Sequence, residues 1–133
     1  MTIKSSKTLV EEALKEIKTL DASKVQELVD KQKSILIDIR DIRELWNEGA
    51  IENAIHIPRG MLEFWMDPES PYYRKDKFND SSKEMILFCA GGLRSALATK
   101  SLKEMGYENI AHVAGGFAAL KLNGFKVIDK EKE

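Results

Sequence analysis

The stretch FCAGGLRSA, residues 88–96, joins an apolar run to a helical pattern and contains the only cysteine of the chain, Cys89. The run that leads into it, MILFC at 85–89, is short and apolar, which is typical of a strand buried on both faces. Residues 94–105 repeat apolar side chains at helical spacing and are followed by Gly106, a common helix end. The stretch therefore predicts a buried strand, a glycine-rich turn and a helix, with Cys89 at the carboxyl end of the strand.

The same alternation of strand and helix continues along the chain. Short apolar runs predict five strands, near residues 17–20, 34–39, 54–57, 85–89 and 110–113. Helical spacing and capping residues predict helices near 6–16, 21–29, 41–48, 94–105 and 117–122. This alternation indicates an α/β fold: a central, mostly parallel, five-stranded sheet flanked by helices, with a further N-terminal helix. Ligands of such sheets bind outside the carboxyl ends of the strands, where Cys89, Asp38 and Arg40 lie.

Capping residues indicate where two of the helices begin. Thr8 and Glu11 form a candidate capping box for the N-terminal helix, in which one reciprocal pair satisfies two free backbone donors. Asp41, with Glu44 three places on, is expected to begin the helix that follows the second strand, and Gly49 is expected to end it.

Length, charge and composition limit the classes of function. The 133 residues suggest one domain, 1–133, long enough to bury a core without disulfides. The net charge of −1 and the pI of about 6.2 indicate no general basic field for nucleic acid or an anionic membrane. A single cysteine cannot form an internal disulfide, and the first residues lack the apolar core of a signal peptide. A cytoplasmic protein with neither nucleic-acid nor membrane partners is therefore expected.

The loop after Cys89 has the composition of an anion-binding nest. A loop that enters a helix turns backbone N–H groups inward, and Gly91 and Gly92 allow it to curl tightly. Such donors favour the thiolate of Cys89 over the thiol. Arg94 adds a permanent charge and a planar fork suited to oxyanions. The simpler alternative is that Cys89 is a small buried hydrophobe, but the glycine pair and the arginine favour a nucleophile.

The length of this loop discriminates between chemistries. Protein tyrosine phosphatases resemble the arrangement, but their signature places five residues between cysteine and arginine. Here four residues separate Cys89 from Arg94. A smaller ring suits a single sulfur atom on the cysteine better than a tetrahedral phosphoryl group. A phosphatase or an arsenate reductase on the same scaffold is therefore the weaker alternative.

Five segments in the expected order resemble single-domain rhodanese-like sulfurtransferases. They are Cys89-x-x-Gly92-x-Arg94-Ser95, Leu36-Ile37-Asp38-Ile39-Arg40 with Glu44, Ala54-Ile55-His56-Ile57-Pro58, Gly106-Tyr107, and Ala114-Gly115-Gly116-Phe117. The resemblance covers about residues 17–125 and implies a three-layer rhodanese-like domain, with residues 1–16 as an N-terminal helical extension.

Two segments fall outside the family pattern or its regular elements. Many members have a Gly-His-Ile-Pro-Gly-Ala run where this chain has GAIENA at 49–54, so an altered turn is expected there without loss of chemistry. Residues 66–82 hold two of the three prolines and little periodicity, which predicts a long surface loop, either a lid or a contact surface.

The resemblance implies a covalent mechanism. Cys89 attacks the outer sulfur of thiosulfate or a similar donor, sulfite leaves, and the persulfide passes its sulfur to cyanide or a thiol. The implied substrate-binding residues are those of the loop together with one arginine: Ala90, Gly91, Gly92, Leu93, Arg94, Ser95 and Arg59. The implied partners are a small sulfur-donor anion and a small-molecule or protein thiol, with no metal or organic cofactor. A persulfide carrier or partner-binding module with little turnover is the second hypothesis.

Several side chains allow more than one interpretation. For Arg94 the alternatives are binding of the donor and bracing of the loop through a salt bridge. For Arg59 they are a position facing the pocket and a simple surface charge. Asp38 and Arg40 are expected to brace strand and loop. His112 lies near the cysteine if their strands are neighbours, but the nest favours the thiolate without a histidine base. Neither of the two histidines has metal-ligand spacing to the cysteine or to the other.

Overall fold

A parallel five-stranded sheet forms the centre of the molecule. The computed structural model describes residues 2–78 and 82–132. The strands of this sheet are β1 (Thr19–Leu20), β2 (Ser34–Asp38), β4 (Ile55–His56), β5 (Glu84–Phe88) and β6 (Ile110–Val113). They lie in the order β1-β6-β5-β2-β4, and each neighbouring pair is parallel. The predicted α/β fold with a five-stranded parallel sheet is confirmed.

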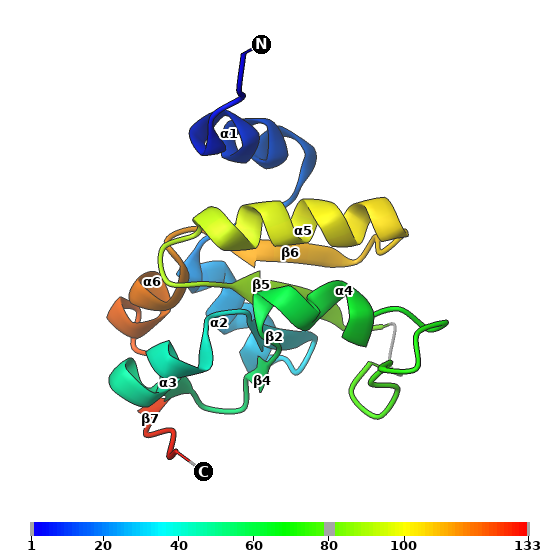
Figure 1. Ribbon diagram of the computed structural model, residues 1–133. Helices are drawn as coiled ribbons and strands as arrows, with labels where there is room; N and C mark the ends of the chain where they lie inside the picture. The colour runs from blue at the N-terminus through cyan, green and yellow to red at the C-terminus, as the bar shows by residue number, and fades with distance from the viewer. Residues whose placement is uncertain (1, 79–81, 133) are drawn as a thin grey trace.

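Helices cover both faces of this sheet (Figure 1). They are α1 (Ser6–Glu16), α2 (Ala22–Asp30), α3 (Ile42–Glu48), the 3-10 turn η1 (Arg59–Met61), α4 (Leu62–Trp65), α5 (Leu93–Met105) and α6 (Gly116–Leu122). α2 and α6 pack on one face, α4 and α5 pack on the other, and α1 packs against the outer side of α5. In the described part of the chain, no helix is both long and apolar enough to cross a membrane.

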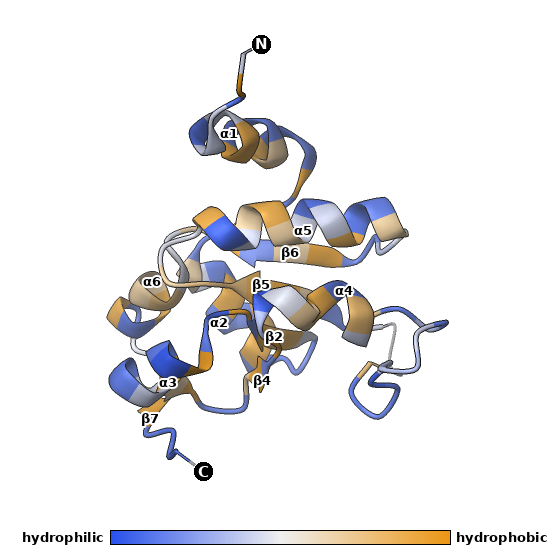
Figure 2. Ribbon diagram, viewed as in Figure 1, coloured by the Kyte–Doolittle hydropathy of each residue, from blue (hydrophilic) through white to orange (hydrophobic). Residues whose placement is uncertain are grey.

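The central strands are buried on both faces. Leu36 and Ile86 belong to the core beneath α2 and α6, whereas Ile37 and Leu87 belong to the core beneath α4 and α5. This is the alternation of side chains that a pleated strand imposes. Figure 2 shows mostly apolar residues along β2, but a mixture of apolar and polar residues on α1 and α5. Burial on two faces explains why these strands read as continuous apolar runs in the sequence.

The N-terminal helix begins earlier than its predicted capping box. α1 starts at Ser6, and the preceding Ser5 is its N-cap, because the Ser5 hydroxyl accepts a hydrogen bond from the Thr8 N–H at 3.0 Å. Thr8 therefore lies inside the first turn, and the box predicted for Thr8 and Glu11 is wrong. Both serine and threonine are good caps, so the type of residue alone does not decide between the two positions.

The third helix begins and ends as predicted. The Asp41 carboxylate accepts a hydrogen bond from Arg43 N–H at 2.9 Å, and the Asp41 N–H donates to Glu44 Oε2 at 2.9 Å, which completes a capping box. Gly49 ends α3 with a φ of 88°, in the region that favours glycine. This helix therefore leaves the carboxyl end of β2 in a fixed direction.

Four short elements are absent from the sequence-based prediction. β3 (Ala50–Ile51) and β7 (Val127–Ile128) form a separate antiparallel pair, and η1 and α4 follow Pro58. Strands of two residues and helices of one turn are too short to produce a recognisable period. β3 occupies the 49–54 segment where an altered turn was expected, and Asn53 there has a φ of 70°.

The segment between α4 and β5 was predicted as a surface loop over 66–82. Met66 is instead fully buried at the end of α4. Further along, Arg74 folds back on α4, because its N–H donates to the Trp65 carbonyl at 3.0 Å and its guanidinium lies 5.2 Å from the Trp65 ring centre. Residues 79–81 of the predicted loop lie outside the described residues.

The order of the strands places Cys89 at a reversal of the sheet. From β2 the chain passes to β4 on one side, and it then returns to β5 on the other side. Crevices that bind ligands form where the strand order reverses, outside the carboxyl ends of the strands. Phe88, the last residue of β5, pairs with Asp38, the last residue of β2. Cys89 follows directly, so the topology alone brings the cysteine to this crevice.

The start of α6 lies against the backbone of the cysteine loop. The Phe117 N–H donates to the Cys89 carbonyl at 2.7 Å, and the Ala118 N–H donates to the Ala90 carbonyl at 3.3 Å. A Cβ atom on Gly116 would lie 2.4 Å from that Cys89 oxygen, and Gly116 has a φ of 57°. Only glycine allows this close approach, so Gly116 lets the start of α6 pack directly against the backbone of the cysteine loop.

We expect Gly116→Ala to lower the free energy of unfolding by about 2 kcal/mol or more, because both the φ and the backbone contact are unfavourable for alanine. Gly60→Ala is the matched control, since a Cβ there would meet nothing within 4 Å. The control should change stability by about 0.5 kcal/mol or less. Urea denaturation of both variants measures the difference, and equal stabilities would contradict the close approach.

Candidate active site

Cys89 is a buried thiol surrounded by hydrogen-bond donors. It lies one residue beyond β5 and is 1% exposed. Its Sγ accepts a hydrogen bond from the Gly92 N–H at 3.1 Å and one from the Ser95 N–H at 3.4 Å. The Ser95 Oγ lies 3.6 Å from the same sulfur. The curled loop thus directs donors at the sulfur atom itself.

The backbone of the loop explains how these donors converge. Gly92 is the N-cap of α5 and has a φ of 108°, which turns its N–H back toward the sulfur. α5 begins at Leu93, one residue earlier than predicted, so Ser95 belongs to its first turn, where backbone N–H groups have no partner within the helix. The 13-residue helix also directs the positive end of its dipole toward the sulfur.

These surroundings favour the thiolate. Burial of the sulfur opposes ionisation and raises the pKa of Cys89, but the Ser95 hydroxyl, the Ser95 and Gly92 N–H groups and the charge of Arg94 outweigh it. The net result is a pKa below the ordinary cysteine value. The thiolate is the nucleophilic form of cysteine, so the lowered pKa favours Cys89 as a nucleophile.

Arg94 is engaged by a carboxylate from another helix. Its two terminal nitrogens donate to the oxygens of Glu44 on α3, at 2.8 and 2.9 Å. The Arg94 hydrogen bond is also the main reason why the pKa of Glu44 is lowered. Arg94 and Glu44 are partly exposed, with 42% and 29% of their side chains accessible. This two-pronged pair joins the first turn of α3 to the first turn of α5, next to Cys89.

Asp38 and Arg40 form the buried support that the sequence predicts for them. The Arg40 guanidinium is fully buried and donates to both carboxylate oxygens of Asp38, at 2.8 to 3.2 Å. It also donates to the Gly49 carbonyl at 2.9 Å and lies 4.0 Å from the ring centre of Phe117. These contacts hold the end of β2 against the end of α3 and the start of α6.

Arg59 lies on η1, in a separate ion pair. Its guanidinium donates to Glu63 on α4 at 2.8 and 3.0 Å, and the Glu63 carboxylate accepts a hydrogen bond from Ser101 of α5 at 2.7 Å. Arg59 therefore braces α4 against α5 through Glu63. A role for Arg59 in substrate binding stays a prediction.

The structure groups most of the predicted site residues in one loop. Gly92 and Ser95 contact the sulfur, Arg94 carries the nearby charge, and Ala90 bonds to α6 through its carbonyl. Gly91 and Leu93 are exposed beside the loop, and 67% of Leu93 is accessible. Leu93 thus presents an apolar surface close to the sulfur.

Two residues that touch this site were not assigned to it from the sequence. Glu44 was recognised as a helix-start residue and as part of a family-like segment, but its pairing with Arg94 spans 50 positions of the chain and was not predicted. His112 was placed near Cys89, but its Nδ1 contacts the Ser95 Oγ at 2.9 Å instead of the sulfur. The sequence feature that could have indicated this contact is a histidine inside the apolar run IAHV at 110–113, since a buried imidazole needs hydrogen-bond partners.

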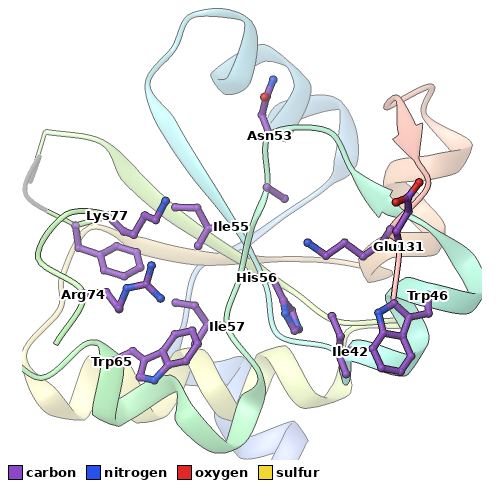
Figure 3. A pocket seen from close by; sticks show the side chains of 13 residues that line it. Ile42, Trp46, Asn53, Ile55, His56, Ile57, Trp65, Arg74, Lys77 and Glu131 are labelled. Carbon is purple, nitrogen blue, oxygen red and sulfur yellow. The ribbon is translucent and has the colours of Figure 1, made fainter. Parts of the chain in front are cut away.

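A cavity of about 930 Å³ lies away from the cysteine loop. It is formed beside β4 by side chains that include Trp46, His56, Trp65 and Arg74 (Figure 3). No residue of the 89–95 loop belongs to its described lining. Among the described residues, no cluster of three or more histidine, cysteine, aspartate or glutamate side chains is arranged to hold a metal ion.

The comparisons with known proteins identify related sequences. The rhodanese-like domain family matches residues 21–123. The tRNA uridine(34) hydroxylase of Prochlorococcus marinus (strain MIT 9215) is 35% identical over 100 residues, which cover 73% of this chain and 31% of that protein. The chain thus spans less than a third of the length of the tRNA uridine(34) hydroxylases that it matches.

Two solved structures share the fold over most of the chain. A protein of unknown function from Rhodopseudomonas palustris CGA009, described as a possible tyrosine phosphatase, has a TM-score of 0.87 at 39% identity, covering 96% of this chain and 98% of that one. A thiosulfate sulfurtransferase from Pseudomonas aeruginosa has a TM-score of 0.77 at 25% identity, covering 96% of this chain and 23% of that one. With fold, cysteine loop and family match in agreement, the chain belongs to the rhodanese-like domain family.

Proposed function

We propose that the protein is a sulfurtransferase that carries sulfur as a persulfide on Cys89. The observation that supports this most is the cradle around Sγ, where two backbone N–H groups and a serine hydroxyl lower the pKa of the thiol. The four-residue spacing to Arg94 makes that cradle small. The expected partners are a small sulfur-donor anion and a thiol acceptor, and the expected location is the cytoplasm.

The proposed reaction has two half-reactions. The Cys89 thiolate attacks the outer sulfur of thiosulfate, a new S–S bond forms, and the old S–S bond breaks so that sulfite leaves with the electron pair. In the second half-reaction a thiolate acceptor, or cyanide, attacks the outer sulfur and Cys89 leaves as thiolate. The loop donors stabilise negative charge on sulfur at both stages. Because the sulfur travels on Sγ itself, the steps require neither a metal nor an organic cofactor.

Arg94 is the proposed binding group for the sulfonate end of the donor. Its pair with Glu44 is partly exposed, and such pairs are worth about 1 kcal/mol or less. An oxyanion that forms two hydrogen bonds with the guanidinium can therefore displace Glu44 at small cost. The alternative is that the pair is permanent and Arg94 only braces the loop.

Two other functions remain as defined alternatives. A carrier that receives sulfur from another protein would use the same cradle, and the acceptor must be external in either case because the chain has one cysteine. A phosphatase is the class named for the similar Rhodopseudomonas palustris structure, but the loop here has four residues between cysteine and arginine. Modification of tRNA is the activity of relatives that are much longer than this chain.

We expect incubation with thiosulfate to add one sulfur atom to the protein, and addition of cyanide to release thiocyanate repeatedly. Intact-mass measurement and thiocyanate release separate an enzyme from a carrier, which would gain the sulfur without turnover. Cys89→Ser should abolish both signals, because it removes the nucleophile. Hydrolysis of an aryl phosphate without any persulfide would favour the phosphatase.

We expect Arg94→Ala to reduce kcat/KM for thiosulfate more than for an uncharged polysulfide, because only the first donor offers a sulfonate. Glu44→Gln is the matched variant, since it keeps the shape and the cap of α3 while releasing the guanidinium. It should lower the KM for thiosulfate and leave the polysulfide unaffected. Equal losses for both donors in Arg94→Ala would show that the arginine braces the loop.

We expect the pKa of Cys89 to lie below that of an unperturbed cysteine, as followed by the ultraviolet absorbance of the thiolate. Because the folded-state pKa is the lower one, the ionised thiol stabilises the fold above the unfolded pKa, and this contribution is lost as pH falls through the folded pKa. Ser95→Ala removes one donor and should raise the midpoint. Cys89→Ser supplies the blank, and a midpoint at or above the ordinary value would contradict the cradle.

A further inference from the structure

A line of hydrogen-bonding groups connects the buried sulfur to the edge strand β1 of the sheet. The Cys89 Sγ lies 3.6 Å from Ser95 Oγ, and Ser95 Oγ lies 2.9 Å from His112 Nδ1. The opposite nitrogen of the same ring, Nε2, lies 3.0 Å from Thr19 Oγ1. Each contact except the one to sulfur has the length of an ordinary hydrogen bond.

The line ends at the surface of the molecule. Cys89, Ser95 and His112 are all buried, with at most 1% exposure. Thr19 is exposed and belongs to β1, the edge strand of the sheet, where it pairs with His112 of β6. The sulfur is therefore shielded from water where it lies, but is linked through the side chains of Ser95 and His112 to the hydroxyl of the exposed Thr19.

The imidazole in the middle of the line is suited to two hydrogen-bond arrangements. Burial lowers the pKa of His112, which favours the neutral ring. A neutral imidazole has one N–H donor and one acceptor nitrogen, and these can exchange places. Hydroxyl groups lie at both nitrogens, from Ser95 and Thr19, and a hydroxyl can donate or accept. Either tautomer is thus satisfied at both ends.

We propose that His112 is a positioning residue that changes tautomer when Cys89 gains or loses its proton, so that the proton moves between Sγ and solvent through Ser95, His112 and Thr19. The inference builds on the proposed function, in which the thiolate of Cys89 is the reactive form. It adds the route by which a thiol closed off from water reaches that form.

The proton balance of the step is complete. In the thiol state Sγ–H donates to Ser95 Oγ, the Ser95 hydroxyl donates to His112 Nδ1, and Nε2–H donates to Thr19. When the thiol ionises, each proton moves one place along this line and water at Thr19 accepts the last one. In the thiolate state Nδ1–H donates to Ser95, the Ser95 hydroxyl donates to Sγ, and the Thr19 hydroxyl donates to Nε2. No bond other than those to hydrogen forms or breaks.

Arg94 is the charged group that acts on the sulfur end of this line, whereas burial is the cause of the lowered His112 pKa. Arg94 on α5 acts on the charge of Cys89, and Glu44 on α3 partly balances Arg94. Around His112, α5 contributes Ser95, β1 contributes Thr19, and β5 contributes the apolar Leu87 as its register partner. A neutral imidazole between two hydroxyl groups carries protons without forming a buried charge, which would be costly.

A competing contact defines the alternative to this proposal. Ser95 Oγ also lies 3.3 Å from the Gly92 carbonyl, to which its hydroxyl can donate. If the hydroxyl stays there, His112 keeps its proton on Nδ1 permanently and only fixes the Ser95 side chain. The two cases differ in one observable, the tautomer of His112 at pH values below and above the Cys89 midpoint.

The test is nitrogen-15 NMR of the reduced, full-length protein across the Cys89 titration. The chain has two histidines, so the spectrum contains one site of interest and one internal control, His56. The proton of His112 should lie on Nε2 below the midpoint and on Nδ1 above it, with the same midpoint as the thiolate absorbance. A tautomer of His112 that does not change through that midpoint would overturn the proposal.

Two variants separate the proposed proton relay, the line of Ser95, His112 and Thr19, from a general effect of pH on the histidine. Cys89→Ser removes the titrating thiol and should abolish the change at His112. Thr19→Val keeps the β-branched shape on the edge strand but offers Nε2 no hydroxyl, so the proton should stay on Nδ1 at every pH. A change that survives in either variant would contradict the relay. Because this test follows protons alone, it is independent of sulfur transfer, and persulfide formation can fail while the relay is confirmed, or the reverse.

Discussion

The buried guanidinium of Arg40 is the constraint on which the site depends. A fully buried cation without partners would cost several kcal/mol, so the elements that supply its partners are held together. Asp38 supplies the charge from β2, Gly49 supplies a carbonyl from the end of α3, and Phe117 supplies a ring from α6. Loss of any one of them would leave the guanidinium partly unsatisfied. The sheet and two helices therefore meet in one arrangement.

Both sides of the cysteine loop follow from that arrangement. The position of α3 allows Glu44 in its first turn to reach Arg94 in the first turn of α5. The position of α6 brings Gly116 against the Cys89 backbone, and the N–H groups that follow it bond to the loop carbonyls. With its carbonyls engaged on one side, the loop turns the N–H groups of Gly92 and Ser95 toward the sulfur. A thiol on a looser turn would not gather these donors.

The parts of this structure that could be predicted from the sequence are local ones. Apolar runs revealed β2 and β5, because burial on both faces leaves few polar positions, and Asp41 with Gly49 marked the ends of α3. The CAGGLR stretch revealed the cysteine loop because the glycines that allow the tight turn and the arginine four residues beyond the cysteine's neighbour are visible in the sequence itself. The pairing of Glu44 with Arg94 and the contact of His112 with Thr19 depend on strand order, which no local pattern records.

The charges around the sulfur bear on how a donor would be held. When Cys89 is a thiolate, it and Glu44 carry two negative charges beside the single positive charge of Arg94. A dianionic donor therefore gains little from long-range attraction, which salt would screen in any case. Its binding must come from short-range hydrogen bonds, of the kind that the Gly92 and Ser95 N–H groups already form with Sγ. Such bonds favour a negatively charged sulfur whatever molecule delivered it. Under the proposed function, the cradle would therefore stabilise a persulfide whatever its donor, and Arg94 with the exposed Leu93 would be left to select among donors.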